Sequence, residues 1–163
     1  AAAPQAGSLA AAGGARAADP EWPTSANRVK AMAVASSGAT EDLLRVELAI
    51  ERGWHVNANP ATYAYLIPTE VVIEGITPLR VRYPASARFA ARFVPEAIDV
   101  YKGRIAIEAF YAKGALARPG ITAQIRVQAC SDEVCLPPET VAVPVFGMEA
   151  PQRAPSPPGT RTK

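Results

Sequence analysis

Apolar and polar residues alternate with a period of two along most of this chain. The clearest case is 44–50, where Arg45 and Glu47 fall on the face opposite the apolar residues. Eight such segments lie between glycine, proline, asparagine and aspartate residues, at 29–34, 44–50, 69–74, 79–83, 88–93, 104–110, 122–128 and 140–145. A period of two indicates strands buried on one face, and many short strands are typical of a sandwich. The sequence therefore predicts an all-β fold of two antiparallel sheets.

The domain organisation follows from where this pattern stops. Residues 1–26 are rich in alanine, glycine and proline, and residues 148–163 are rich in proline, so both are predicted to be flexible tails. The folded unit is predicted to span residues 27–147. No segment shows a helical stripe, and residues 96–100 are expected to form one helical turn at most.

Composition excludes several classes of function. The net charge is only +2 and the arginines are scattered, so no nucleic-acid partner is predicted. No apolar run approaches the roughly 18 residues of a membrane span. The first residues resemble what remains after signal cleavage, or a linker from a longer protein. Neither a Ser-His-Asp set nor a glycine-rich phosphate loop is present, which argues against a hydrolase or nucleotide enzyme.

Two cysteines, Cys130 and Cys135, are the only ones in the chain. They lie between the alternating runs 121–129 and 136–145, which places both sulfurs at the end of a predicted β-hairpin, close enough to bond. A disulfide that closes so short a loop stabilises a fold by roughly 2 kcal/mol, less than one closing a long loop. A redox role therefore competes with a structural one.

Three interpretations of the pair stay open on the residues alone. The pair forms a structural disulfide, binds a metal, or exchanges electrons with other thiols. A closed zinc site needs four ligands, and the chain offers one histidine, His55, and no further thiol, so no metal or other cofactor is predicted. Exchange needs one thiolate within reach of the other sulfur, and a short loop provides this.

The residues around the cysteines resemble a known family. Gln128 precedes Cys130 by two residues, and Cys135 is followed by Leu136 and then Pro137-Pro-Glu-Thr. This arrangement is similar to the active-site segment of the N-terminal periplasmic domain of the DsbD thiol:disulfide interchange proteins. Residues 53–60 and 99–103 resemble that family less specifically, and the likeness covers residues 28–146.

The resemblance implies an immunoglobulin-like antiparallel β-sandwich that acts as a thiol:disulfide oxidoreductase. Such a domain receives electrons from a membrane donor of the DsbD type and passes them to periplasmic thioredoxin-fold proteins, as in cytochrome c biogenesis. It implies a periplasmic monomer, or an extracytoplasmic domain of a membrane protein. The alternative is a non-catalytic secreted β-sandwich that binds another protein and carries a structural hairpin disulfide.

The resemblance also implies roles for single residues. Cys135 would form the mixed disulfide with partners, and Cys130 would resolve it. Tyr101 would shield the pair as a cap, and Asp99 beside it would disfavour the thiolate, unless it is an ordinary solvated acid.

Three further residues are expected to neighbour the cysteines, namely His55, Gln128 and Pro137. His55 and Trp54 stand where the family has a tyrosine-rich strand. The imidazole of His55 titrates near neutrality in water, so it is a candidate base, although a buried packing role with one hydrogen bond is the simpler interpretation.

Overall fold

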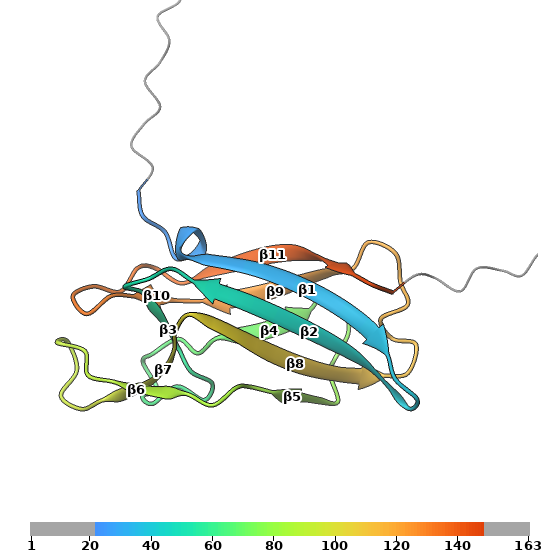
Figure 1. Ribbon diagram of the computed structural model, residues 1–163, viewed down its shortest axis with the longest axis horizontal. Coiled ribbons are helices and arrows are strands. Elements are labelled where there is room, and N and C mark those ends of the chain that lie inside the picture. Colours follow the sequence, from blue (N-terminus) through green and yellow to red (C-terminus); the bar gives the residue numbers. More distant parts are fainter. Residues whose placement is uncertain (1–21, 149–163) are drawn as a thin grey trace, which may run out of the picture.

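The computed structural model describes residues 22–148, which form two packed β-sheets (Figure 1). The all-β sandwich predicted from the period-two pattern is confirmed. Within these residues the one helical element is a 3-10 turn, η1 (Ala26–Arg28). The strands among them are β1 (Val29–Ser37), β2 (Glu41–Ile50), β3 (His55–Asn57), β4 (Glu70–Ile73), β5 (Arg80–Arg82), β6 (Ala87–Phe89), β7 (Ile98–Tyr101), β8 (Arg104–Ala112), β9 (Thr122–Val127), β10 (Ala129–Cys130) and β11 (Glu139–Phe146).

The larger sheet has seven strands in the order β4-β9-β11-β1-β2-β8-β5. Neighbouring strands are antiparallel except β1 and β11, which run parallel. Alternate residues of β2 from Asp42 to Ile50 are buried, and Arg45 and Glu47 lie on the exposed face. This strand therefore follows the predicted alternation, with one face toward the core and one toward solvent.

The main hydrophobic core lies between the two sheets. Leu44, Val46 and Ile107 of the larger sheet are 0% exposed. They belong to one cluster with Val56 and Tyr101 of the smaller sheet. Because burying a side chain of this size contributes about 1.5–3 kcal/mol, this cluster is the chief source of stability that the fold provides.

The smaller sheet has four short strands in the order β10-β3-β7-β6, gathered at one end of the molecule (left in Figure 1). Directly opposed residues of antiparallel strands point to the same face of a sheet. The register therefore places Ala129, Val56 and Tyr101 on the inner face, toward the core. Cys130 and His55, the next opposed pair, lie on the outer face.

A second apolar cluster covers this outer face. Its buried members are Leu66, Ala91, Ile98 and Val100. Phe89 of β6 packs against them and lies opposite Ile98 in the register. The smaller sheet is thus covered on both sides, by the main core on one and by this cluster on the other.

Three strands of the smaller sheet, β3, β7 and β10, were not predicted, and the helical turn expected over residues 96–100 is wrong. Residues 98–100 belong to β7, where three of the four residues are buried, and all three residues of β3 are buried. A strand buried on both faces loses the alternation that identifies strands in a sequence. These segments are also too short to be recognised by any other periodicity.

The ends of the described residues lie close to the predicted limits of the folded unit, 27 and 147. Ser25 is fully buried, two residues before the predicted limit at 27. At the other end, Met148 packs against the main core. Residues 1–21 and 149–163 of the predicted tails lie outside the described residues.

Candidate redox site at the cysteine hairpin

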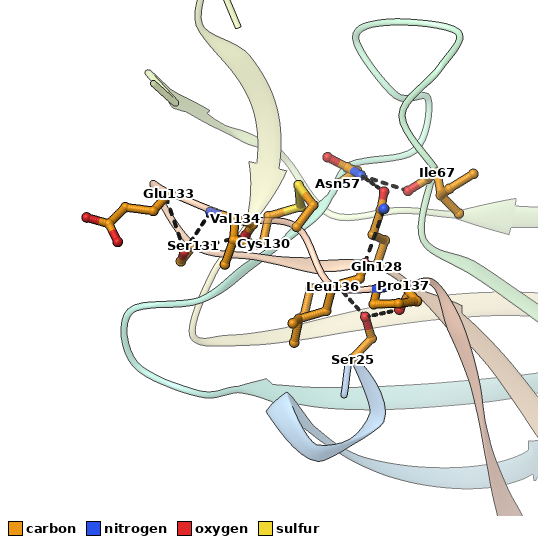
Figure 2. The surroundings of a disulfide bond; sticks show 12 residues. Ser25, Asn57, Ile67, Gln128, Cys130, Ser131, Glu133, Val134, Leu136 and Pro137 are labelled. Carbon is orange, nitrogen blue, oxygen red and sulfur yellow. Dashed lines mark hydrogen bonds between the residues drawn. A yellow bond between two sulfur atoms is a disulfide. The ribbon is translucent and has the colours of Figure 1, made fainter. Parts of the chain in front are cut away.

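A disulfide joins Cys130 and Cys135 across a four-residue turn that follows β10. The two cysteines form an isolated β-bridge, and their Cα atoms are 4.0 Å apart. The turn is built by its own residues, because the Ser131 hydroxyl accepts hydrogen bonds from the amides of Glu133, at 3.2 Å, and Val134, at 3.1 Å (Figure 2). Serine favours turns for this reason. The prediction that the sulfurs meet at the end of a hairpin is confirmed.

The two cysteines differ in exposure. Cys130 is 0% exposed, whereas Cys135 is half-buried and follows the exposed residues 132–134 of the turn. Val134, next to Cys135, leaves 49% of its surface exposed. Of the two cysteines, Cys135 is therefore the one that reaches the surface at this end of the sandwich. The residues alone left the two sulfurs unranked, and the structure shows that the two cysteines differ in exposure.

The base of the hairpin is held by Ser25, which precedes η1. The Ser25 hydroxyl donates a hydrogen bond to the Pro137 carbonyl at 2.6 Å and accepts one from the Ala129 amide at 3.0 Å (Figure 2). One side chain thus connects the two arms that carry the cysteines. Ser25 was not predicted as a site residue because it lies in the segment assigned to the tail. A lone serine carries no periodic signal that could have revealed it.

Gln128 fixes the hairpin to the rest of the smaller sheet. Its amide nitrogen donates to the Leu136 carbonyl at 3.3 Å, and its amide oxygen accepts from the side chain of Asn57 at 3.4 Å. Asn57 in turn donates to the Ile67 carbonyl at 2.9 Å (Figure 2). Of the predicted neighbours, Gln128 and Pro137 therefore both contact the cysteine segment, and both act on its position.

His55 lies opposite Cys130 in the register of β3 and β10. It is 1% exposed, and the centre of its ring is 4.3 Å from that of Phe89. Burial is the main reason that the pKa of His55 is lowered to about 4; the Lys102 ammonium lowers it further, and the Asp132 carboxylate opposes both. The imidazole is therefore neutral at physiological pH.

A pocket of about 540 Å³ opens beside His55. Trp54, Phe89, Lys102 and Asp132 are among the residues that line it. The ammonium of Lys102 lies 4.1 Å from the centre of the Phe89 ring. Phe89 is thus an aromatic side chain on the disulfide face of the smaller sheet, and no sequence feature had singled it out.

The two predicted cap residues lie elsewhere. Tyr101 is 2% exposed within the main core, and its hydroxyl accepts a hydrogen bond from the Asn59 amide at 3.1 Å. Burial is the main cause that raises the pKa of its phenol. Because side chains alternate along a strand, Tyr101 and Asp99 both point away from the face that bears Cys130. Neither side chain is therefore on the disulfide face, where the predicted shielding role would place it.

Asp99 instead holds the neighbouring loop in place. Its carboxylate accepts hydrogen bonds from the hydroxyls of Thr62, at 3.3 Å, and Ser86, at 3.2 Å. Arg88 forms an ion pair with it at 3.4 Å. The acidic residues beside the disulfide are Asp132 and Glu133 of the turn, and the Asp132 carboxylate lies 4.0 Å from the guanidinium of Arg92.

No group of three or more histidine, cysteine, aspartate or glutamate side chains among residues 22–148 is arranged to hold a metal ion. Nor does any helix in this part of the chain have the length and apolar character needed to cross a membrane.

The fold and the site together define a β-sandwich domain with a disulfide hairpin at one end, in which one cysteine is buried and the other is half-buried. The chain belongs to the family of the N-terminal domain of the thiol:disulfide interchange protein DsbD, whose family model matches residues 25–147. That match begins at the buried Ser25. The family supports a role in thiol:disulfide interchange, and it implies thioredoxin-like partners and membrane domains in general.

Two solved structures are similar to this chain. The reduced N-terminal domain of DsbD from Neisseria meningitidis is 17% identical, with 74% of this chain and 85% of that one covered and a TM-score of 0.49. The N-terminal periplasmic domain of ScsB from Proteus mirabilis is 16% identical, with 76% of this chain and 48% of that one covered and a TM-score of 0.51. The second likeness supports the fold. No curated protein matches the chain.

Proposed function

We propose that this domain carries electrons by disulfide exchange from a membrane-embedded donor to thioredoxin-fold proteins outside the cytoplasm. The observation that carries the proposal is the difference in burial between two bonded cysteines in one short turn. A disulfide that only staples a fold has no need to present one sulfur. Membership of the DsbD N-terminal family supports the same chemistry.

Cys135 is the sulfur that meets the partner, and Cys130 is the sulfur that resolves the intermediate. The Cys135 thiolate attacks the disulfide of the partner, so that a mixed disulfide forms and one partner sulfur leaves as a thiolate. The Cys130 thiolate then attacks the sulfur of Cys135 and releases the second partner thiolate. Two electrons pass to the partner, and the domain is left with the Cys130–Cys135 bond. Exchange with the donor reverses these steps and restores both thiols.

Phe89 takes the shielding role that the family resemblance implied for Tyr101. Its ring covers the outer face of the smaller sheet beside His55, which lies opposite Cys130. The acidic turn adds electrostatic protection, because the Asp132 and Glu133 carboxylates disfavour a nearby thiolate. Together these groups slow reaction with small thiols until a partner displaces the shield.

A matched pair of variants tests the roles. The reduced Cys130→Ala variant keeps a free Cys135, so it should accumulate a mixed disulfide with an oxidised thioredoxin-fold protein on non-reducing gels. The Cys135→Ala variant keeps only the buried cysteine and should trap little. Titration of the wild-type disulfide against a redox buffer should give a potential above about −300 mV, the level below which structural disulfides typically lie.

The opposite results define the alternative function. A disulfide that stays oxidised in strongly reducing buffer, with no trapped partner in the Cys130→Ala variant, would identify a non-catalytic binding module with a structural bond. Equal trapping by both variants would leave exchange in place but refute the assignment of Cys135.

A further inference from the structure

His55 is a buried polar side chain with an unsatisfied atom. It is 1% exposed, and its Nε2 has no hydrogen-bond partner among residues 22–148. Buried polar atoms in folded proteins are almost always paired, since an unpaired one lowers stability. His55 also stands directly opposite Cys130, so the side chains of both residues lie on the outer face of the smaller sheet.

The surroundings of His55 come from four elements. Lys102 follows β7, Asp132 lies in the cysteine turn, and Glu51 and Arg52 lie between β2 and β3; all four line the pocket that His55 borders. From β6 comes the uncharged ring of Phe89, which contacts the imidazole. Burial and Lys102 together keep the imidazole neutral. A neutral imidazole has a lone pair on one ring nitrogen and can accept a proton there.

The resolving step of the proposed exchange needs such an acceptor. Cys130 must lose its proton to attack Cys135, because the thiolate and not the thiol is the nucleophile. Yet Cys130 is 0% exposed, so water does not reach it readily and burial disfavours its charged form. The carboxylates of Asp132 and Glu133 lie on the exposed turn. The imidazole of His55 is a possible proton acceptor that lies on the same buried face as Cys130.

We propose that His55 accepts the proton of Cys130 in the resolving step, an inference that rests on the proposed exchange function. The proton moves from the Cys130 sulfur to the imidazole, and the resulting thiolate attacks the sulfur of Cys135. The Cys130–Cys135 bond forms as the bond between Cys135 and the partner breaks. The partner sulfur leaves as a thiolate and takes up a proton, while the imidazolium gives up its own.

The same burial that makes the imidazolium unfavourable ensures that it is short-lived, so the site returns to its neutral state after each turnover. In the opposite direction, attack of the donor on Cys135 releases Cys130 as a thiolate. The imidazole then carries a proton back to this sulfur through the adjoining pocket. His55 thus serves both directions of exchange at the buried cysteine.

The test distinguishes the reactions of the two sulfurs as two kinetic phases. Reduced protein is mixed in a stopped-flow instrument with an aromatic disulfide that releases a coloured thiolate. The first phase depends on reagent concentration and reports attack by Cys135. The second is independent of reagent concentration and reports attack by Cys130 on the mixed disulfide. Both rates are measured as a function of pH for the wild type and for the His55→Gln, His55→Phe and Asp132→Asn variants.

Near neutral pH, the second phase should be slower by at least about tenfold in both His55 variants. General acid–base catalysis typically contributes about 10²–10⁴-fold, so tenfold is the smallest loss that we expect. The first phase of both variants should change little. The deficit should shrink as the pH rises, because hydroxide then deprotonates Cys130 without help. His55→Phe keeps an aromatic ring against Phe89, so a deficit shared with His55→Gln follows from the lost base and not from lost packing. Asp132→Asn should not slow the second phase, because the loss of this carboxylate favours a nearby thiolate.

Three outcomes would overturn the inference. These are an unchanged second phase in both His55 variants, an equal slowing of both phases at every pH, or a deficit that Asp132→Asn reproduces. Failure of the proposed function looks different. In that case wild-type protein shows both phases with the reagent but forms no mixed disulfide with thioredoxin-fold proteins.

Discussion

The two sheets of this sandwich differ in length, in burial and in what holds them. In the larger sheet, β1, β2 and β8 have nine or ten residues each and pair over long registers. The strands of the smaller sheet have two to four residues. The larger sheet is fixed chiefly by its backbone ladders and the main core. The smaller sheet depends much more on side-chain hydrogen bonds, from Ser25, Asn57 and Gln128.

Because of this difference, the larger sheet supplies most of the stability, whereas the smaller sheet carries the disulfide. Regions with few ladder hydrogen bonds open more easily than long, well-packed strands. The disulfide lies at the edge strand of the smaller sheet, where a local adjustment can admit a partner without disturbing the main core. The division suits a domain whose cysteines must change partners while the fold persists.

The largest expected effect is on the free energy of unfolding, and it shows whether stability resides in the larger sheet. Leu44 of β2 and Ile98 of β7 are both 0% exposed, but they belong to the main and the smaller cluster respectively. Leu44→Ala should lower the free energy of unfolding by about 2–5 kcal/mol, and Ile98→Ala should fall at the lower end of this range, because a small cluster relaxes more readily. Urea denaturation of the oxidised proteins measures both.

Met32→Ala serves as the control, since Met32 leaves 50% of its surface exposed on β1. Its effect should stay within about 0.5 kcal/mol. A loss in Ile98→Ala that equals or exceeds the loss in Leu44→Ala would contradict the division between the two sheets.

The larger sheet could be predicted from the sequence because its strands bury one face. In β2, Arg45 and Glu47 alternate with apolar residues because one face of the strand is exposed and the other is buried. The smaller sheet could not be predicted in the same way. β3 and β7 have neighbours on both faces, so polar residues such as His55 and Asn57 are buried there and the pattern is lost.

The candidate site was predictable only where it is local in the sequence. Gln128 and Pro137 flank the cysteines along the chain, and both contact the hairpin in the structure. Tyr101 lies on the inner face and not beside the disulfide, because a shift of one residue along a strand moves a side chain to the other face. Ser25 and Phe89 reach the hairpin from distant segments, and no local pattern reports such a contact.

The next largest effect is a pH dependence that belongs to the smaller sheet. The pKa of His55 is lowered from 6.5 to about 4 in the folded protein, mainly by burial. Between these values the unfolded chain binds a proton at His55 that the folded chain does not. The free energy of unfolding should therefore fall as the pH drops from 6.5 toward 4, by up to about 3 kcal/mol in total. Urea denaturation at a series of pH values measures this loss.

His55→Phe isolates this contribution, because the difference between wild type and variant removes the common titration of the carboxylates. That difference should vary across this pH range and level off above it. For Leu44→Ala, the loss relative to wild type should be nearly the same at every pH. A wild-type curve parallel to that of His55→Phe would show that His55 titrates equally in both states.

The smallest effect is kinetic and decides which aromatic ring shields the disulfide. Phe89 lies on the outer face of the smaller sheet beside His55, whereas Tyr101 lies on the inner face, so removing the Phe89 ring should expose the cysteine pair. Phe89→Ala should speed the reduction of the disulfide by a small thiol severalfold. Tyr101→Leu should leave this rate unchanged while it lowers the free energy of unfolding, since it loses core packing and the hydrogen bond to Asn59. The reverse pattern of rates would restore Tyr101 as the cap, and it would mean that shielding acts through the core and not from the solvent side of the smaller sheet.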